Sequence, residues 1–313
     1  MIGFRDIVSG FKELGLDRGD IVLVHSSFKS FGGVEGGPQT VIDALLEVLG
    51  EEGTLVMPTF NFDFCEQYNR SGKGYFDVEN TPSKMGILTE LVRKMPGAKR
   101  SVNPIYSVAV YGKLADKLSS VNDKNVFGKG SIFGKLHELN AKIMIIGLSY
   151  NNSWTFVHYI EQMEGCDYRY LKDFSGTIVV SGKKYEDTFS MLVRDMDKKV
   201  ITNVDPMGEI LEKRGAVKIK KIGQSIVKLM KAKEVYDITA AEMKKNPRIL
   251  VVFLHGLGDN IMATPAIRAL RKKYPKAYIA IMGLKTLPVK AVSYTHLRAH
   301  ETSLHLVCRL LLE

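Results

Sequence analysis

Residues 19–33 read Gly-Asp-Ile-Val-Leu-Val-His-Ser-Ser-Phe-Lys-Ser-Phe-Gly-Gly, and this stretch decides the fold class. Its apolar run at 21–24 predicts a buried strand, because continuous apolar runs are typical of strands covered on both faces. The polar and glycine-rich residues that follow predict a loop. Pro38 suits the first turn of a helix that we expect to run to about Leu49. Strand, loop and helix in this order predict an α/β protein.

The same alternation continues along the chain. Strands and helices that take turns predict an α/β sandwich with its sheet covered on both faces. Beyond residue 167 the pattern changes to a hairpin followed by helices. The expected strands are 53–58, 105–111 and 142–147, the hairpin strands are 176–181 and 184–193, and the expected helices are 3–14, 84–95, 113–119, 131–139, 206–214 and 223–245.

A second start follows Asn246-Pro247, a dipeptide that favours a boundary. Residues 249–254 predict a strand, 261–274 a basic helix and 278–282 another strand, which together make one incomplete βαβ unit. We therefore expect three segments. Residues 1–245 form the main domain, 246–290 a short fragment, and 291–313 a tail.

Composition narrows the class of protein. The chain has 313 residues, 45% hydrophobic and 25% charged, which is typical of a globular protein and excludes disorder. Its start does not resemble a secretory signal, and no apolar run approaches the ~20 residues of a transmembrane helix, so a cytoplasmic protein is expected. The three scattered cysteines predict neither a disulfide framework nor a zinc site.

The net charge of +10 is unevenly placed, since residues 246–290 alone carry +7. The first 245 residues are nearly balanced. Nucleic-acid binding is therefore not expected of the main domain.

Three local patterns are candidates for chemistry. The first is the loop after the strand at 21–24, where small hydroxyls and exposed glycine N–H groups are what phosphate or pantetheine binding requires. The alternative is an ordinary glycine-rich loop, because the spacings of the dinucleotide and P-loop motifs are absent. The candidate binding residues are Ser26, Ser27, Lys29, Ser30, Gly32 and Gly33.

The second pattern surrounds Arg100 and Ser107, just ahead of an expected strand. An arginine flanked by hydroxyls can bind phosphate, and the alternative is a solvated turn.

The third pattern is the pair His158 and Glu161, which lie three residues apart and share one face if the segment is helical. A carboxylate beside an imidazole fixes its tautomer and raises its basicity. The alternative is a buried structural histidine.

Together these patterns make residues 19–173 similar to the aminoglycoside 3-N-acetyltransferase family. The resemblance implies a three-layer α/β/α sandwich and an enzyme that moves an acetyl group from acetyl-CoA to an amine. The following 70 or so residues are compatible with the rest of such a domain. The matching pieces are residues 24–27, 32–38, 53–59, 100–107, 131–133, 145–147 and 155–161.

The resemblance also implies roles. His158 would be the general base, Glu161 would hold it, and the 26–33 loop with Arg100 and Ser107 would bind acetyl-CoA. No metal is expected, and Cys166 is interpreted as a packing residue. Acidic residues suit a cationic acceptor. The acceptor candidates are Asp63, Glu164 and Asp167, with Glu66 and Asp173 nearby.

The C-terminal segments add alternatives. Residues 249–283 resemble the opening of heptosyltransferase-type glycosyltransferases, with Asp259 as the matching base. This favours, as an alternative acceptor, an amino sugar of surface-glycan assembly. A catalytically silent CoA- or sugar-binding domain is the alternative of another class. Residues 292–302 resemble a translated sequencing adapter, so we set aside the metal-like spacing of His296, His300, Glu301 and His305.

Overall fold

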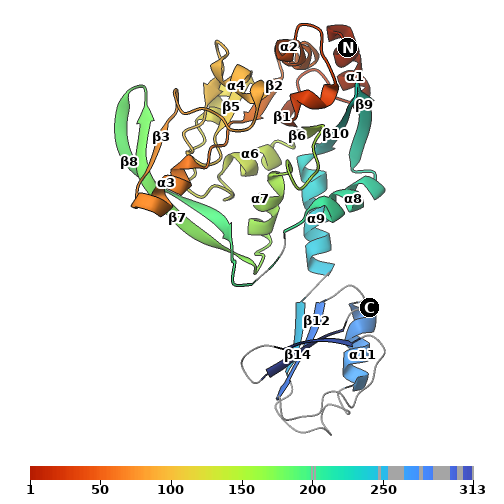
Figure 1. Cartoon of the computed structure of the whole chain (residues 1–313). Coiled ribbons are helices and arrows are strands. Elements are labelled where there is room, and N and C mark those ends of the chain that lie inside the picture. Colours follow the sequence, from red (N-terminus) through yellow and green to blue (C-terminus); the bar gives the residue numbers. More distant parts are fainter. Residues whose placement is uncertain are drawn as a thin grey trace. The chain divides into compact units, whose positions relative to one another are not determined.

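The computed structural model describes residues 1–198, 200, 202–245, 248–252, 264–274, 278–284, 297–301 and 306–311. The chain divides into two compact units, Met1–Thr239 and Ala240–Glu313. The first unit is built around a seven-stranded sheet (Figure 1). In order across the sheet its strands are β4 (Lys99–Arg100), β5 (Val108–Gly112), β2 (Thr54–Pro58), β1 (Ile21–Ser26), β6 (Lys142–Ile146), β10 (Ser225–Lys231) and β9 (Val217–Ile222).

The centre of this sheet is parallel and its flanks are antiparallel. β1 pairs in parallel with β2 and with β6, in registers that place Ile21 beside Thr54 and Ser26 beside Ile146. β5 runs antiparallel to β2, and β10 runs antiparallel to β6. The carboxyl ends of the three central strands therefore lie at one edge of the sheet.

Helices cover both faces of the sheet. On one face, apolar residues of α1 and α2 pack with Val22 and Val24 of β1 in a single core cluster. Side chains alternate along a strand, so Leu23 points to the other face, where α6 and α7 lie (Figure 1). The predicted three-layer sandwich is confirmed. The helices of this unit are α1 (Phe4–Leu14), α2 (Pro38–Leu49), α3 (Asp63–Ser71), α4 (Ile87–Lys94), α5 (Ala115–Ser119), α6 (Ile132–Glu138), α7 (Phe156–Met163), α8 (Asp205–Lys213) and, reaching into the second unit, α9 (Ala232–Lys245).

A smaller sheet stands beside the main one, in the order β3-β7-β8. β7 (Arg169–Val180) and β8 (Lys183–Arg194) form the predicted hairpin, which is longer than expected. β3 (Gly74–Asp77) adds to β7 in parallel, and α3 packs against both strands. Neither α3 nor β3 is among the expected elements.

One expected helix is wrong over its first 9 of 23 residues. Residues 223–245 were predicted to be helical, but residues 225–231 form β10 and only residues from 232 onward form α9. β9 and β10 are a hairpin whose second strand completes the main sheet against β6. The other expected elements of residues 1–147 are present, with ends that differ by a few residues.

In the second unit, β11 (Arg248–Val252) pairs in parallel with β12 (Tyr278–Leu284), and α11 (Thr264–Lys273) lies between them in sequence. This is the βαβ arrangement that the sequence predicts. The unit also has β13 (Leu297–Glu301) and β14 (Leu306–Leu311), which extend its sheet on the far side of β12. Asp259, His296 and His305 lie outside the described residues. In the parts of the chain that the structure describes, no helix is long and apolar enough to cross a membrane.

Candidate active site

The candidate site lies at the carboxyl edge of the three parallel strands. β1 ends at Ser26, β2 at Pro58 and β6 at Ile146. In open α/β sheets, ligands bind beyond the carboxyl ends of the strands. The chain leaves β6 at Gly147 and reaches α7 at Phe156, so the helix that carries the predicted catalytic pair starts from this edge.

His158 and Glu161 lie on one face of α7, as their spacing predicts. The Nδ1 atom of His158 is 2.6 Å from the Oε2 atom of Glu161. The Glu161 side chain is 4% exposed and that of His158 is 25% exposed. With Nδ1 held by the carboxylate, the other ring nitrogen, Nε2, is the one available to a substrate proton.

Two residues after α7 complete the surroundings of Glu161. The Tyr168 hydroxyl donates a hydrogen bond of 2.5 Å to Oε1 of Glu161, and the Arg169 Nε atom forms an ion pair with Oε2 at 2.9 Å. Burial alone would raise the pKa of Glu161, but His158, Arg169 and Tyr168 outweigh it and the pKa is lowered. The carboxylate is therefore ionised at neutral pH.

The His158 ring rests against an aromatic cluster. Phe127 meets it edge-on, with ring centroids 5.5 Å apart, and packs in turn on Phe133 and Tyr106. Phe60, which follows β2, joins the same cluster. Phe127 thus packs directly on the imidazole, and the other rings of the cluster hold Phe127 in place.

The 26–33 loop lies at the same edge and is tightly packed. Ser26 and Ser27 are half-buried and Lys29 is exposed, so all three can meet a ligand. Gly147 makes the close approach possible. It has φ +64°, and a Cβ there would stand 2.0 Å from the Ser30 hydroxyl oxygen.

Ser30 itself is used within the protein. Its hydroxyl donates to the Ser27 carbonyl at 2.6 Å and lies 2.8 Å from the Ser225 hydroxyl. Its observed contacts therefore hold the loop to the first residue of β10. Gly32 also packs nearby, since a Cβ on it would collide with the Gln224 side chain.

Arg100 and Ser107, the other expected acetyl-CoA residues, are hydrogen-bonded within the protein, and their role in binding acetyl-CoA stays a prediction. The Arg100 guanidinium donates five hydrogen bonds to protein oxygens, among them the carbonyls of Thr59 and Val78. Ser107 is fully buried and donates to the Thr59 carbonyl. Both residues fix the segment after β2, because their hydrogen-bonding groups are occupied by the protein itself. Burial also lowers the pKa of Arg100, to about 10.

The expected acceptor carboxylates have partners of their own. Asp63, at the start of α3, forms an ion pair with Lys84. Glu164 accepts a hydrogen bond of 2.9 Å from the Tyr236 hydroxyl. Asp167 lies in the exposed turn before β7 and also has a contact with the protein. Their role in binding an acceptor stays a prediction.

The sequence analysis did not single out several residues that the structure places in or near the site. Tyr168 and Arg169 carry no motif, although an aromatic and a basic residue within eight positions of Glu161 is a signal that a search for its partners can use. His25 is buried, its Nε2 atom has no hydrogen-bond partner among the described residues, and burial lowers its pKa to about 4. Burial raises the pKa of Cys166 to about 11, so this thiol is protonated at neutral pH.

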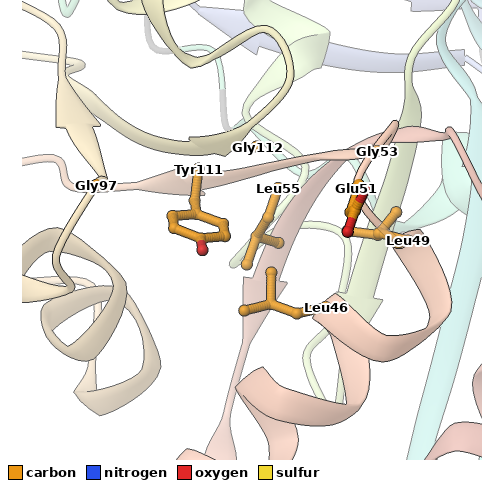
Figure 2. Close-up of a pocket in the computed structure, with 9 residues that line it drawn as sticks. Leu46, Leu49, Glu51, Gly53, Leu55, Gly97, Tyr111 and Gly112 are labelled. Carbon is orange, nitrogen blue, oxygen red and sulfur yellow. The ribbon is translucent and has the colours of Figure 1, made fainter.

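Two further features bear on chemistry, metal-ligating clusters and a pocket away from His158. Among the described residues, no group of His, Cys, Asp and Glu side chains can hold a metal ion. A pocket of about 520 Å³ lies at the amino end of β2, opposite the edge that holds His158, between α2 and β5 (Figure 2). Its ionisable lining residues are Glu51 and Tyr111, and no histidine, cysteine, serine or lysine lines it. The lining residues are Leu46, Leu49, Gly50, Glu51, Gly53, Leu55, Gly97, Tyr111 and Gly112.

A partly exposed imidazole, backed by a buried carboxylate at the carboxyl edge of an α/β sheet, is an arrangement that can remove a proton from a nucleophile. Comparison with known proteins makes the class specific. The family model of aminoglycoside 3-N-acetyltransferases matches residues 23–244. The chain belongs to this family of acyltransferases.

Relatives and solved structures agree. The prophage-derived aminoglycoside N(3')-acetyltransferase-like protein YokD of Bacillus subtilis is 29% identical over 250 residues, covering 74% of this chain and 89% of its own. Aminoglycoside N(3)-acetyltransferase III of Acinetobacter baumannii is 32% identical over 170 residues, covering 50% of this chain and 59% of its own. The crystal structure of the aminoglycoside acetyltransferase AAC(3)-Xa has a TM-score of 0.69 at 25% identity, covering 78% of this chain and 93% of its own.

Proposed function

We propose that the protein transfers the acetyl group of acetyl-CoA to an amine of an aminoglycoside, at the 3-N position. The contact of 2.6 Å between His158 and the buried Glu161 carries this proposal, because it supplies an oriented general base. Relatives that are named as aminoglycoside N(3)-acetyltransferases support the acceptor class.

The chemistry follows from the state of the amine. An amine must be neutral at nitrogen to attack a thioester carbonyl, yet near pH 7 it is mostly protonated. The ammonium first loses one proton to solvent. His158 then takes a second proton from the attacking nitrogen at Nε2 while a bond forms between that nitrogen and the carbonyl carbon. The carbon–sulfur bond breaks, and the imidazolium gives its proton to the departing thiolate. Glu161 stabilises the imidazolium that exists between these events.

Residues at the same edge of the sheet suit both substrates. The exposed Lys29 and the half-buried Ser26 and Ser27 suit the anionic and polar arm of acetyl-CoA. We place the acceptor beside His158, with Asp63, Glu164 and Asp167 as the carboxylates that attract its ammonium groups. Attack is direct, so no acyl-enzyme on Cys166 is needed.

The test compares the full chain with His158→Gln. Release of free thiol from acetyl-CoA is followed with gentamicin, other aminoglycosides and amino sugars as acceptors. We expect turnover with aminoglycosides that falls by about 10²–10⁴ in the variant. Turnover with amino sugars but not with aminoglycosides would show that the acceptor is an amino sugar. Binding of CoA without turnover on any amine would mean a silent binding domain.

We infer that the catalytic domain is residues 1–245 and that the remainder has another origin. The βαβ arrangement of β11, α11 and β12 supports a truncated glycosyltransferase opening at 246–290. The amino-acid sequence of residues 292–302 supports an adapter-derived tail. Sequencing the source DNA across codons 246–313 tests this. An uninterrupted second glycosyltransferase domain in place of the tail would support the fragment, and the same tail in independent isolates would contradict an adapter.

A further inference from the structure

Arg169 shares a single carboxylate oxygen with the catalytic imidazole. Its Nε atom lies 2.9 Å from Oε2 of Glu161, and the same oxygen lies 2.6 Å from Nδ1 of His158. The Arg169 side chain is only 10% exposed. One negative charge is therefore divided between a fixed cation and a group that must gain and lose a proton.

This division has a consequence for the base. A buried carboxylate paired with an imidazole alone stabilises the protonated ring, and a protonated ring cannot accept a proton from an amine. Arg169 supplies a permanent positive charge at the same oxygen. With Arg169 present, the cluster is neutral when His158 is neutral. Without Arg169, the cluster is neutral only when His158 is protonated.

We propose that Arg169 is a positioning residue that keeps His158 in its neutral, proton-accepting form by occupying part of the charge of Glu161. Tyr168 assists by holding the other carboxylate oxygen, so that Oε2 faces both partners. The inference rests on the proposed function, since it deepens the account of the same base.

Other ionisable groups near the cluster do not duplicate this charge. Burial raises the pKa of Cys166, and also that of Tyr106, which reaches the cluster from the segment before β5, so both are neutral at assay pH. Groups on neighbouring elements are engaged elsewhere. Arg194 on β8 donates to Met196 and Thr202, and Lys124 pairs with Asp187. Glu164 accepts from Tyr236. Cys65 on α3 is neutral, because burial raises its pKa to about 12.

The experiment measures the pH profile of kcat/KM for one aminoglycoside between pH 5 and 9, with the full chain. The acceptor's own titration is then common to every variant. Arg169→Met removes the charge at similar length, Arg169→Gln removes it but keeps a polar group, and Arg169→Lys restores it. We expect the acidic limb to move to higher pH by about one unit in the first two variants. Arg169→Lys is expected to restore the wild-type position, and Tyr168→Phe to give a smaller shift.

A second readout does not need turnover. Histidine labelled with ¹⁵N reports ring protonation by NMR in the substrate-free chain, with the His158 signals identified by their loss in His158→Gln. The same upward shift in the titration midpoint is expected in Arg169→Met and Arg169→Gln. Wild-type turnover with unshifted profiles and midpoints in both variants overturns the inference alone. No wild-type turnover overturns the proposed function, while the NMR shift still tests the role of Arg169.

Discussion

Gln162 on α7 donates a hydrogen bond of 2.9 Å from its Nε2 atom to Oδ1 of Asn125. The same Oδ1 atom accepts the backbone N–H of Phe127 at 3.3 Å, which fixes the orientation of both amides. Phe127 is the ring that meets His158 edge-on. The helix that carries the base therefore also anchors the segment that packs against it.

We expect Gln162→Met to lower kcat several-fold, because Phe127 and His158 lose their common anchor. Stability is expected to change by less than about 1 kcal/mol, since the change removes one hydrogen bond and also the unpartnered, buried Oε1 atom. Steady-state kinetics and urea denaturation measure the two effects. Gln39→Met on α2, which loses a similar bond to Asp43, is the control that leaves kcat unchanged.

Glu161→Gln is expected to lower stability at pH 7 by about 3 kcal/mol, because Arg169 is left buried without its charge partner. The folded pKa of Glu161 lies below its usual value of 4.5, so its contribution is complete above that pH and is lost as the pH falls through the folded pKa. Denaturation at pH 7 and at pH 3 checks this. A difference between wild type and variant that does not shrink at pH 3 contradicts it.

Acidification also destabilises the protein through His25, but there by adding a buried charge rather than by removing one. Its folded pKa of about 4 lies below the usual 6.5, so the unfolded chain binds a proton first and stability falls as the pH drops from 6.5 toward 4. Between pH 7 and 5 this loss amounts to about 2 kcal/mol. His25→Gln is expected to remove that part of the pH dependence. Equal slopes of unfolding free energy against pH in both proteins would rule this out.

Substitutions at Arg100 and Lys29 distinguish a cation that stabilises the fold from one that binds acetyl-CoA. Arg100→Met leaves several carbonyls without donors, and we expect a loss of about 3 kcal/mol in stability with an unchanged KM for acetyl-CoA. Lys29→Met is expected to raise that KM about fivefold, more so at low salt, with unchanged stability. Kinetics at two salt concentrations and thermal melts distinguish the pair. The reverse pattern would support acetyl-CoA binding by Arg100 and a structural role for Lys29.

The sequence predicts an element best where residues that start or end helices flank a periodic apolar pattern. α2 begins at Pro38 and ends at Leu49 as expected, because a proline opens it and Gly50 closes it. The segment 223–245 fails because residues 225–231 owe their conformation to pairing with β6, about 80 positions earlier. Short-range periodicity contains no information about such a partner.

The site shows the same limit. His158 and Glu161 can be paired from sequence, because three residues on one helix fix their separation. The contacts of Tyr168 and Arg169 with Glu161 depend on the turn at 164–168, which folds the start of β7 back onto α7. The contacts of Arg100 could not be predicted either, because a sequence shows the donors of a guanidinium but not the carbonyls that accept from them.

The close approach of Gly147 to Ser30 has a kinetic meaning. The 26–33 loop is wedged between the end of β6 and the start of β10, so its shape exists before any ligand arrives. A ligand that enters a preorganised loop avoids an ordering cost of ~0.5–1.5 kcal/mol per immobilised side chain. Its arrival is then a one-step encounter, with an observed rate that rises linearly with ligand concentration and never levels off to a slow loop closure.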